Sequence, residues 1–331
     1  MKKVVKSILF FMILLLLVIR VNEIVVRKTD NRYYIMREEY QKNGLEHYDI
    51  AVFGSCHAYR TVNSKLIEQE TGLSSYNFSN PSEIIPSTYL NMYDKFRDFT
   101  PKVALIETWG VHAYDSYLEQ ETIDGAFSLM TDSFPLSLEK IKLIDDFDNL
   151  DLISANFPLA RYKSRFYDFE IDETDYAYSY VAMKEQQDES LTWLYYEMDQ
   201  RMENNGYYPV HAKIEETYLD YKISVDYKES MPIEADLMKY VDKIIELCEE
   251  NDVIPIFFRA PYITNENECK KNHYLEKYLK QKGYQYIDLE EEIVFDYQNE
   301  MGDLHHLNDA GATRATMYLI DEIEKVIKNQ K

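Results

Sequence analysis

Residues 48–59 read Tyr48-Asp-Ile-Ala-Val-Phe-Gly-Ser-Cys-His-Ala-Tyr59 and contain a short apolar run that ends at Gly54. Such a run is typical of a strand that is buried on both faces of a parallel sheet. Glycine permits a tight turn directly after the strand, so Cys56 and its neighbours follow at the carboxyl end. Functional groups of doubly wound sheets collect at these carboxyl ends. We therefore expect a site around Cys56.

Four further apolar runs repeat this pattern, and helical segments separate them. The expected strands are 48–54, 75–78, 102–109, 253–259 and 284–289, and the expected helices are 64–71, 86–99, 234–251, 268–282 and 309–328. Strands that alternate with helices indicate a parallel sheet with helices on both faces and right-handed crossovers. The predicted fold class is α/β, a three-layer α/β/α doubly wound parallel sheet of five strands in the flavodoxin-like manner.

The stretch 111–232 between the third and fourth strands lacks this alternation. It contains helical segments at 136–145 and 191–204, and it is too long for a structureless loop. We expect an inserted, mostly helical subdomain that caps the catalytic edge. The predicted organisation is a cytoplasmic tail and signal-anchor helix (1–28), a connector (29–47), a first core half (48–110), the cap (111–232) and a second core half (233–331).

The N-terminus carries a basic start followed by an apolar run at 8–19 and a second apolar patch at 24–26. No pair of small residues is spaced for signal peptidase, and no lipobox cysteine follows. We therefore expect an uncleaved anchor that spans the cell membrane once, from about Ser7 to Val26. The lysines at the start place the N-terminus in the cytoplasm and the main domain outside.

Charge and cysteine content restrict the possible partners and cofactors. The chain has 331 residues and a net charge of −23, so an acidic body would repel a phosphate backbone, and nucleic-acid binding is not expected. The three cysteines, Cys56, Cys248 and Cys269, are too few for a disulfide framework, and pairing of the last two stays open. The sequence shows no calcium-loop spacing, paired-cysteine zinc motif or glycine-rich phosphate loop, so neither a metal nor a cofactor is predicted.

A second motif lies between the fifth strand and the last helix, at Gly302-Asp-Leu-His-His-Leu-Asn-Asp-Ala-Gly311. Asp303 stands three residues ahead of His306, so it can fold back in a turn and accept the imidazole N–H. This contact fixes the tautomer and leaves the second nitrogen available as a base. Both motifs lie at the same edge of the predicted sheet, which predicts a triad of Cys56, His306 and Asp303. A shift of one residue in the loop would exchange His305 for His306.

These two motifs resemble blocks I and V of the SGNH hydrolase superfamily. The resemblance covers about residues 46–110 and 250–328 and implies the catalytic core of an esterase or acyltransferase. Membrane-anchored members, such as the proteins of lipoteichoic-acid D-alanylation, move acyl groups onto or off cell-envelope polymers. The resemblance thus implies an extracytoplasmic acyltransferase or esterase for polysaccharide or teichoic-acid-like polymers. Its implied partners are an acyl donor or membrane acyl carrier, the polymer acceptor and a membrane-bound O-acyltransferase.

The chain departs from the family pattern at three positions. Cys56 takes the place of the nucleophilic serine, so the acyl-enzyme would be a thioester. Ser79 stands where block II has its oxyanion-hole glycine, with Asn80 as an alternative side-chain donor. Glu107 stands where block III has its asparagine. These departures leave a rival interpretation open, in which the chain is a catalytically degenerate SGNH scaffold that acts as a membrane-tethered binding or assembly module.

Three further residues are candidates for the substrate-binding region. We expect the side chain of His57 to point away from Cys56, with a structural or acyl-pocket role and not that of a base. Arg259, at the end of the fourth strand, either binds an anionic donor or forms a salt bridge with one of the many acids. Glu107 is either buried beside the site or caps a helix.

Overall fold

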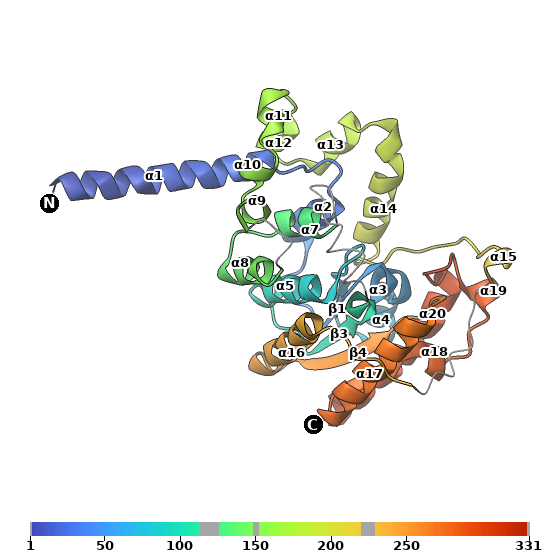
Figure 1. Cartoon of the computed structure of the whole chain (residues 1–331). Coiled ribbons are helices and arrows are strands. Elements are labelled where there is room, and N and C mark those ends of the chain that lie inside the picture. Colours follow the sequence, from blue (N-terminus) through green and yellow to red (C-terminus); the bar gives the residue numbers. More distant parts are fainter. Residues whose placement is uncertain (1, 113–125, 148–151, 220–228, 330–331) are drawn as a thin grey trace. The chain divides into compact units, whose positions relative to one another are not determined.

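The computed structural model describes residues 2–112, 126–147, 152–219 and 229–329 (Figure 1). The chain divides into two compact units, of which the first contains residues 1–42 and 121–195 and the second contains residues 43–120 and 196–331. This division differs from the expected one. The predicted connector up to residue 42 belongs with the insertion, and residues 196–232 of the predicted insertion belong with the core.

Five parallel strands form the centre of the second unit, in the order β2-β1-β3-β4-β5. The strands are β1 (Ile50–Phe53), β2 (Ser75–Asn77), β3 (Val103–Glu107), β4 (Ile254–Arg259) and β5 (Gln285–Asp288). The chain passes from β1 to β2 on one side and then returns to β3 on the other, so β1 and β3 flank the topological switch point. Phe53 pairs with Ile106, so the carboxyl ends of these two strands are adjacent.

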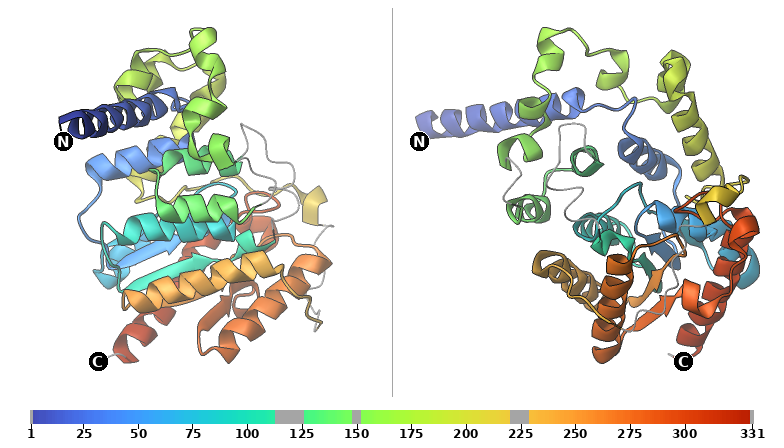
Figure 2. Two further views of the ribbon diagram at one scale, coloured as in Figure 1. Left: turned by 60° about the vertical axis from the view of Figure 1, so that its left-hand side comes forward. Right: turned by 45° about the vertical axis from the view of Figure 1, so that its right-hand side comes forward.

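Helices cover both faces of this sheet (Figure 2). The helix α20 (Asp309–Asn329) packs on α3 (Cys56–Thr61) and α4 (Ser64–Thr71), whereas α5 (Ile85–Phe96) packs on α16 (Ala235–Glu250). Side chains of β1 at Ile50 and Val52 join one apolar cluster with Leu319 of α20. The remaining helices of this unit are η1 (Trp109–Val111), α15 (Glu216–Leu219), α17 (Glu266–Gln281), α18 (Leu289–Glu292) and α19 (Tyr297–Glu300).

The segment after Glu203 lies against the edge strand β2, which explains why it belongs with the core. The backbone N–H of Asn77 donates to the carbonyl oxygen of Asn205 at 2.8 Å. Gly206 has φ +85°, and a Cβ there would lie 1.9 Å from the carbonyl oxygen of Asn77. Only glycine fits this close approach of two backbones. The contact is therefore made by main chain, which a search for apolar periodicity does not detect.

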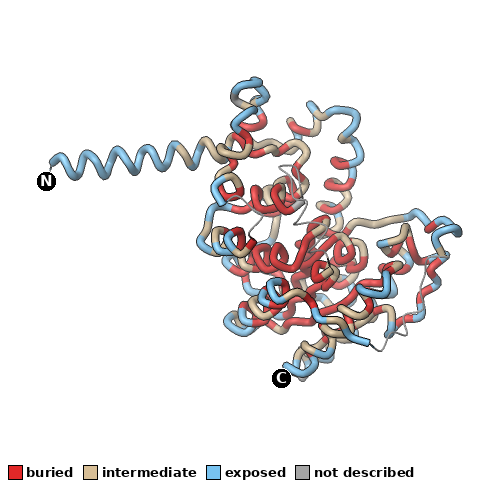
Figure 3. The backbone as a smooth tube through the Cα atoms, viewed as in Figure 1, coloured by how far each residue is buried: buried red, intermediate tan, exposed pale blue. Residues whose placement is uncertain are grey.

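The first unit begins with α1 (Lys2–Val25), which is long and apolar enough to cross a membrane. Its most apolar window has no buried residue, and Figure 3 shows most of the helix exposed. The other helices are α2 (Arg32–Asn43), α7 (Ala126–Ser133), α8 (Leu138–Asp145), α9 (Leu152–Asn156), α10 (Pro158–Arg161), α11 (Ser164–Tyr167), α12 (Glu173–Tyr176), α13 (Tyr180–Gln186) and η2 (Glu189–Leu191). The helix α14 (Thr192–Glu203) runs from this unit into the second.

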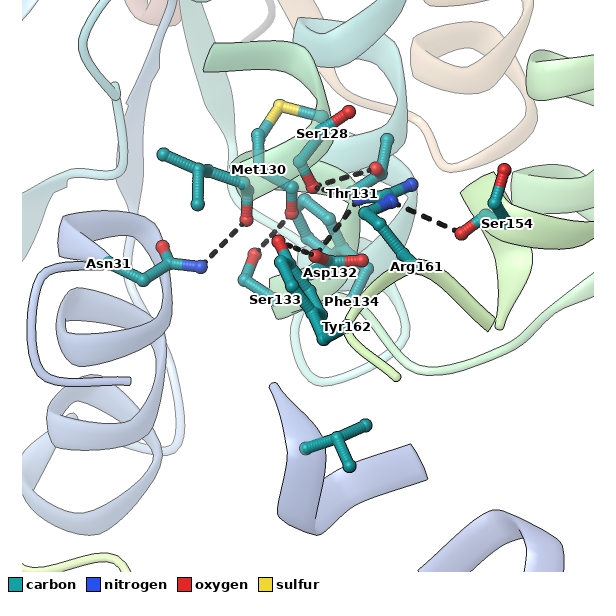
Figure 4. A network of polar contacts seen from close by, with 12 residues as sticks. Asn31, Ser128, Met130, Thr131, Asp132, Ser133, Phe134, Ser154, Arg161 and Tyr162 are labelled. Carbon is teal, nitrogen blue, oxygen red and sulfur yellow. Dashed lines mark hydrogen bonds and ion pairs between the residues drawn. The ribbon is translucent and has the colours of Figure 1, made fainter. Parts of the chain in front are cut away.

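A buried polar network holds the first unit together (Figure 4). The side chain of Asp132 is 0% exposed. It forms an ion pair with Arg161 at 2.9 Å and accepts a hydrogen bond from the Tyr162 hydroxyl at 2.7 Å. These partners balance the charge of a carboxylate that water cannot reach. The Asn31 amide, directly ahead of α2, donates to the carbonyl oxygen of Leu129 at 2.9 Å. The segment between α1 and α2 is thus hydrogen-bonded to α7 through Asn31 and is not a simple linker.

Candidate active site

The turn that follows β1 depends on Gly54. This residue has φ +136°, and a Cβ there would lie 2.6 Å from the Cβ of Glu107 on the neighbouring strand. The following Ser55 caps α3, because its Oγ accepts the backbone N–H of His57 at 3.2 Å. Cys56 is the first residue of α3 and therefore stands at the carboxyl end of β1, as the sequence predicts.

The loop between Met301 and Leu307 presents the predicted acid and base. The His306 Nδ1 lies 2.8 Å and 3.0 Å from the two carboxylate oxygens of Asp303. A carboxylate can only accept, so Nδ1 carries the proton and donates it, and Nε2 of the neutral ring is left unprotonated. His305 is exposed, and its backbone N–H also donates to Asp303 at 2.8 Å. The expected register, with His306 and not His305 as the paired ring, is confirmed.

The loops after β1 and β5 meet as predicted. The Cys56 sulfur and one ring nitrogen each of His57 and His306 all lie within 4.8 Å of one another. The His306 Nε2 is buried and has no hydrogen-bond partner among the described residues, and the neighbouring Cys56 is one of the groups that raise the pKa of the ring. The described part of the chain therefore brings the sulfur, the imidazole and the carboxylate together in one row.

The electrostatic environment of Cys56, His306 and Asp303 favours the charged form of each side chain. Burial raises the pKa of the Cys56 thiol, but the His306 ring, the Ser82 backbone N–H and the Arg60 guanidinium together bring it below its ordinary value. Burial lowers the pKa of His306, but its contacts with Asp303 and Cys56 raise it above the ordinary value. Despite partial burial, the contact with His306 lowers the pKa of Asp303 to about 2. A thiolate beside an imidazolium is the pair that these shifts stabilise.

A second row lies behind the sulfur and connects Glu107, Ser55 and His57. Glu107 is 1% exposed and accepts from the Ser55 hydroxyl at 2.7 Å and from the Trp109 backbone N–H at 2.6 Å. Burial raises the pKa of Glu107 to about 7. The Ser55 Oγ also lies 3.0 Å from the His57 Nδ1. Of the two alternatives for Glu107, the structure therefore shows the buried residue beside the site.

The expectation that His57 points away from Cys56 is wrong. Its ring stacks on Trp109 with centroids 5.1 Å apart, and it lies equally far from the ring of His306. Ser55 fixes this orientation, because it binds both the backbone N–H and the Nδ1 of His57. The ring is 2% exposed, and its Nε2 has no partner among the described residues.

The two predicted oxyanion donors are occupied by internal partners. The Ser79 backbone N–H donates to the side-chain oxygen of Asn77 at 3.2 Å. The Asn80 amide donates to Glu83 at 2.8 Å and to the carbonyl oxygen of Phe78 at 3.2 Å. These internal hydrogen bonds satisfy the Ser79 backbone N–H and the Asn80 amide, as is usual for buried polar groups. The Ser79 backbone N–H and the Asn80 amide are therefore not available to an oxyanion in this arrangement, whereas the buried Ser79 hydroxyl has no partner among the described residues.

Arg259 forms a salt bridge, the second of its two expected roles. Its guanidinium lies 2.9 Å from Asp288 and 2.8 Å from Glu290, and its side chain is 1% exposed. Asp288 is the last residue of the neighbouring strand β5 and Glu290 follows it, so the arginine connects the ends of β4 and β5. The salt bridges occupy the guanidinium, which supports a structural role for Arg259 in place of donor binding.

Two residues of the site, Arg60 and Ser82, were not predicted from the sequence. The Arg60 Nη1 lies 3.2 Å from a carboxylate oxygen of Asp303. Its position four residues after Cys56 on α3 places both side chains on one helix face, which is a signal that the sequence contains. The Ser82 backbone N–H helps to lower the pKa of Cys56, and Ser82 has φ +51°. A non-glycine residue in this conformation is uncommon, so no sequence pattern indicates it.

The other two cysteines are far less suited to reaction. Cys248 on α16 and Cys269 on α17 are both buried and free, so the disulfide that the sequence left open is not formed. Burial raises the pKa of Cys248 to about 12 and also raises that of Cys269. Buried thiols of this kind are inert. Cys56 is the only cysteine of the three whose pKa is lowered.

No family model matches the chain, and the comparison with curated proteins finds no significant match. The fold is nevertheless plain: an α/β protein with a five-stranded, all-parallel sheet and an N-terminal apolar helix. The resemblance to the SGNH superfamily therefore depends on the two motifs and on the place of their side chains at the sheet edge.

Proposed function

We propose that the chain is a membrane-anchored, extracytoplasmic acyltransferase or esterase of the SGNH type. It acts on acyl groups of cell-envelope polysaccharides or teichoic-acid-like polymers through a thioester at Cys56. One observation supports this proposal most strongly. The Cys56 sulfur lies within 4.8 Å of a ring nitrogen of His306, and Asp303 holds the Nδ1 of that ring at 2.8 Å. An activated nucleophile beside a base that a third group orients is the general arrangement of covalent acyl transfer.

The first half of the reaction forms the acyl-enzyme. His306 accepts the proton of the Cys56 thiol, and the resulting thiolate attacks the carbonyl carbon of the acyl donor. The Ser82 backbone N–H, which helps to lower the pKa of Cys56, and the Cys56 backbone N–H stabilise the oxyanion that develops. The tetrahedral intermediate then collapses, the bond to the leaving group breaks, and His306 returns its proton to that group. The product is a thioester at Cys56.

The second half transfers the acyl group to an acceptor hydroxyl of a sugar or polyol, or to water. His306 removes the proton of the acceptor, whose oxygen attacks the thioester carbonyl. The carbon–sulfur bond breaks, and the thiolate receives the proton from His306. A thioester is more activated than an oxygen ester, so it favours transfer to a hydroxyl and an ester as product.

The acyl donor follows from the compartment. Cytosolic acetyl-CoA does not reach a domain outside the membrane, so the donor is a membrane acyl carrier, supplied by a membrane-bound O-acyltransferase partner. The exposed apolar helix α1 supports this location, because it is long enough to anchor the protein beside such a partner. The lysines at its start retain the N-terminus in the cytoplasm.

Thiol labelling tests the proposal. The full chain in detergent is treated with iodoacetamide, and the modified peptides are quantified over time by mass spectrometry. We expect Cys56 to react faster than Cys248, Cys269 and an unfolded thiol. We also expect H306Q to slow the reaction, whereas H305Q, a change of the same kind on the exposed neighbour, has little effect.

The opposite result would favour the rival function. If Cys56 reacts no faster than a thiol in the unfolded chain, or if H306Q leaves its rate unchanged, the acyl-enzyme proposal fails. The chain is then better explained as a membrane-tethered binding or assembly module on an SGNH scaffold. The internal hydrogen bonds of Ser79 and Asn80 favour this second function, because they remove two donors from the oxyanion site.

A further inference from the structure

Three side chains at the site converge on one point with the atoms that bind transition metals. The Cys56 sulfur and a ring nitrogen each from His57 and His306 lie within 4.8 Å of one another. Acyl transfer uses only one of these two imidazoles. The second, His57, is 2% exposed and has a buried Nε2 with no partner in the described parts of the chain. A buried ring nitrogen without a partner requires an explanation.

The protonation of both rings follows from their other nitrogen. The His306 Nδ1 donates to Asp303 at 2.8 Å, so in the neutral ring that binds a metal the lone pair is on Nε2, and metal binding displaces the proton of the imidazolium. The Ser55 hydroxyl donates to the Glu107 carboxylate at 2.7 Å, so its oxygen accepts the Nδ1–H of His57 at 3.0 Å. The Nε2 of His57 therefore also carries a lone pair. Each ring thus has one nitrogen that can bind a metal, and one nitrogen of each ring lies within 4.8 Å of the sulfur.

This arrangement is the one that protein zinc sites use. A metal-binding histidine almost always donates its other ring N–H to a carboxylate or an equivalent acceptor, which fixes the ring and its tautomer. Here Asp303 does so directly for His306, and Glu107 does so through Ser55 for His57. We propose that Cys56, His57 and His306 form a binding site for a divalent transition-metal ion of the Zn²⁺ type, with a fourth position open to water or substrate.

The distances allow such a site after a small closure. Ligand atoms around a tetrahedral zinc lie roughly 3.5 Å apart, so atoms within 4.8 Å of one another need to move by about 1 Å. Thiolate and imidazole ligands favour zinc over calcium or magnesium, which prefer oxygen. Bound metal would occupy both the sulfur and the base. If the proposed acyl transfer is correct, the metal therefore inhibits it reversibly.

Cobalt titration tests the site without measuring activity. The full chain in detergent is freed of metal with a chelator and titrated with Co²⁺, and the sulfur-to-cobalt charge-transfer absorption is recorded. We expect one equivalent of Co²⁺ to give this absorption and one equivalent of Zn²⁺ to remove it. The C56S variant should abolish the band, and C248S, the matched change at a buried cysteine, should retain it.

The Glu107→Gln variant tests the site without changing any ligand. The glutamine amide donates to the Ser55 oxygen, so the Ser55 hydroxyl turns to donate to the His57 Nδ1 and moves the ring proton to Nε2. Loss of an outer-shell partner lowers metal affinity by about 10–100-fold, and we expect a loss of this size. Circular dichroism confirms that each variant is folded.

The outcomes separate this proposal from the proposed function. Absence of the cobalt band in the wild type, its persistence in C56S, or unchanged affinity in E107Q would overturn the metal site. Acylation of Cys56 is measured separately on the chelated protein with an activated ester. Metal binding without acylation would refute only the acyl-enzyme, whereas acylation without metal binding would refute only the metal site.

Discussion

The buried Glu107 makes a quantitative prediction about stability and pH. Burial raises its pKa from 4.5 to about 7, so the folded protein binds a proton there more tightly than the unfolded chain does. The stability that this proton contributes is fully present below pH 4.5 and is lost as the pH rises through 7. At roughly 1.4 kcal/mol for each pKa unit, the loss amounts to about 3 kcal/mol.

The E107Q variant removes this titration while it imitates the protonated acid. Urea unfolding of both proteins in detergent, followed by tryptophan fluorescence at pH 5 and pH 8, gives the free energy of unfolding in each state. Relative to E107Q, we expect the wild type to lose about 3 kcal/mol between the two values of pH. Glu83, whose pKa burial raises to about 8, contributes to both proteins and cancels in the difference. Parallel pH dependences for the two proteins would show that Glu107 does not take up a proton on folding.

Three further predictions follow from the site and the anchor. The G54A substitution should lower the free energy of unfolding in urea by about 3 kcal/mol, because strain at φ +136° adds to the contact of the new Cβ with Glu107. The control G72A, whose Cβ meets no atom within 4 Å, should lower it by about 1 kcal/mol. Equal losses would contradict the close approach at Gly54. The D303N substitution should slow acylation of Cys56 by about 100-fold or more, because His306 loses the partner that fixes its tautomer. It should also move the pH profile of acylation downward, because Asp303 raises the pKa of the His306 base; an unchanged profile would exclude this role. Deletion of residues 2–19 should move the chain from the membrane to the soluble fraction after cell lysis, and continued sedimentation with the membrane would exclude α1 as the anchor.

The sequence predicts the sheet well because its strands are strongly patterned. All five expected strands are present, and β4 ends at Arg259 as predicted. The helix α4 has the predicted bounds, because the Asn63 side chain accepts the Leu66 N–H at its start and Gly72 takes a left-handed conformation at its end. These are local signals of polarity and turn chemistry, and distant residues do not modify them.

The sequence predicts the triad but not its surroundings. Asp303 and His306 belong to one turn, so their pairing follows from spacing. The oxyanion donors instead depend on which internal partner each amide finds in the folded loop. The orientation of His57 likewise depends on Ser55 and on Glu107, which comes from another strand. Side-chain rotamers and hydrogen bonds between distant segments leave no periodic trace in a sequence.

The most direct test of the account is whether an acyl group becomes attached to the Cys56 sulfur. The chelated full chain is mixed with a short-chain activated ester, quenched in acid, and examined by intact-mass spectrometry followed by peptide mapping. We expect one added acyl group on Cys56, with much less in H306Q and none in C56A. An unmodified wild-type protein, or a group attached equally well in C56A, would contradict it.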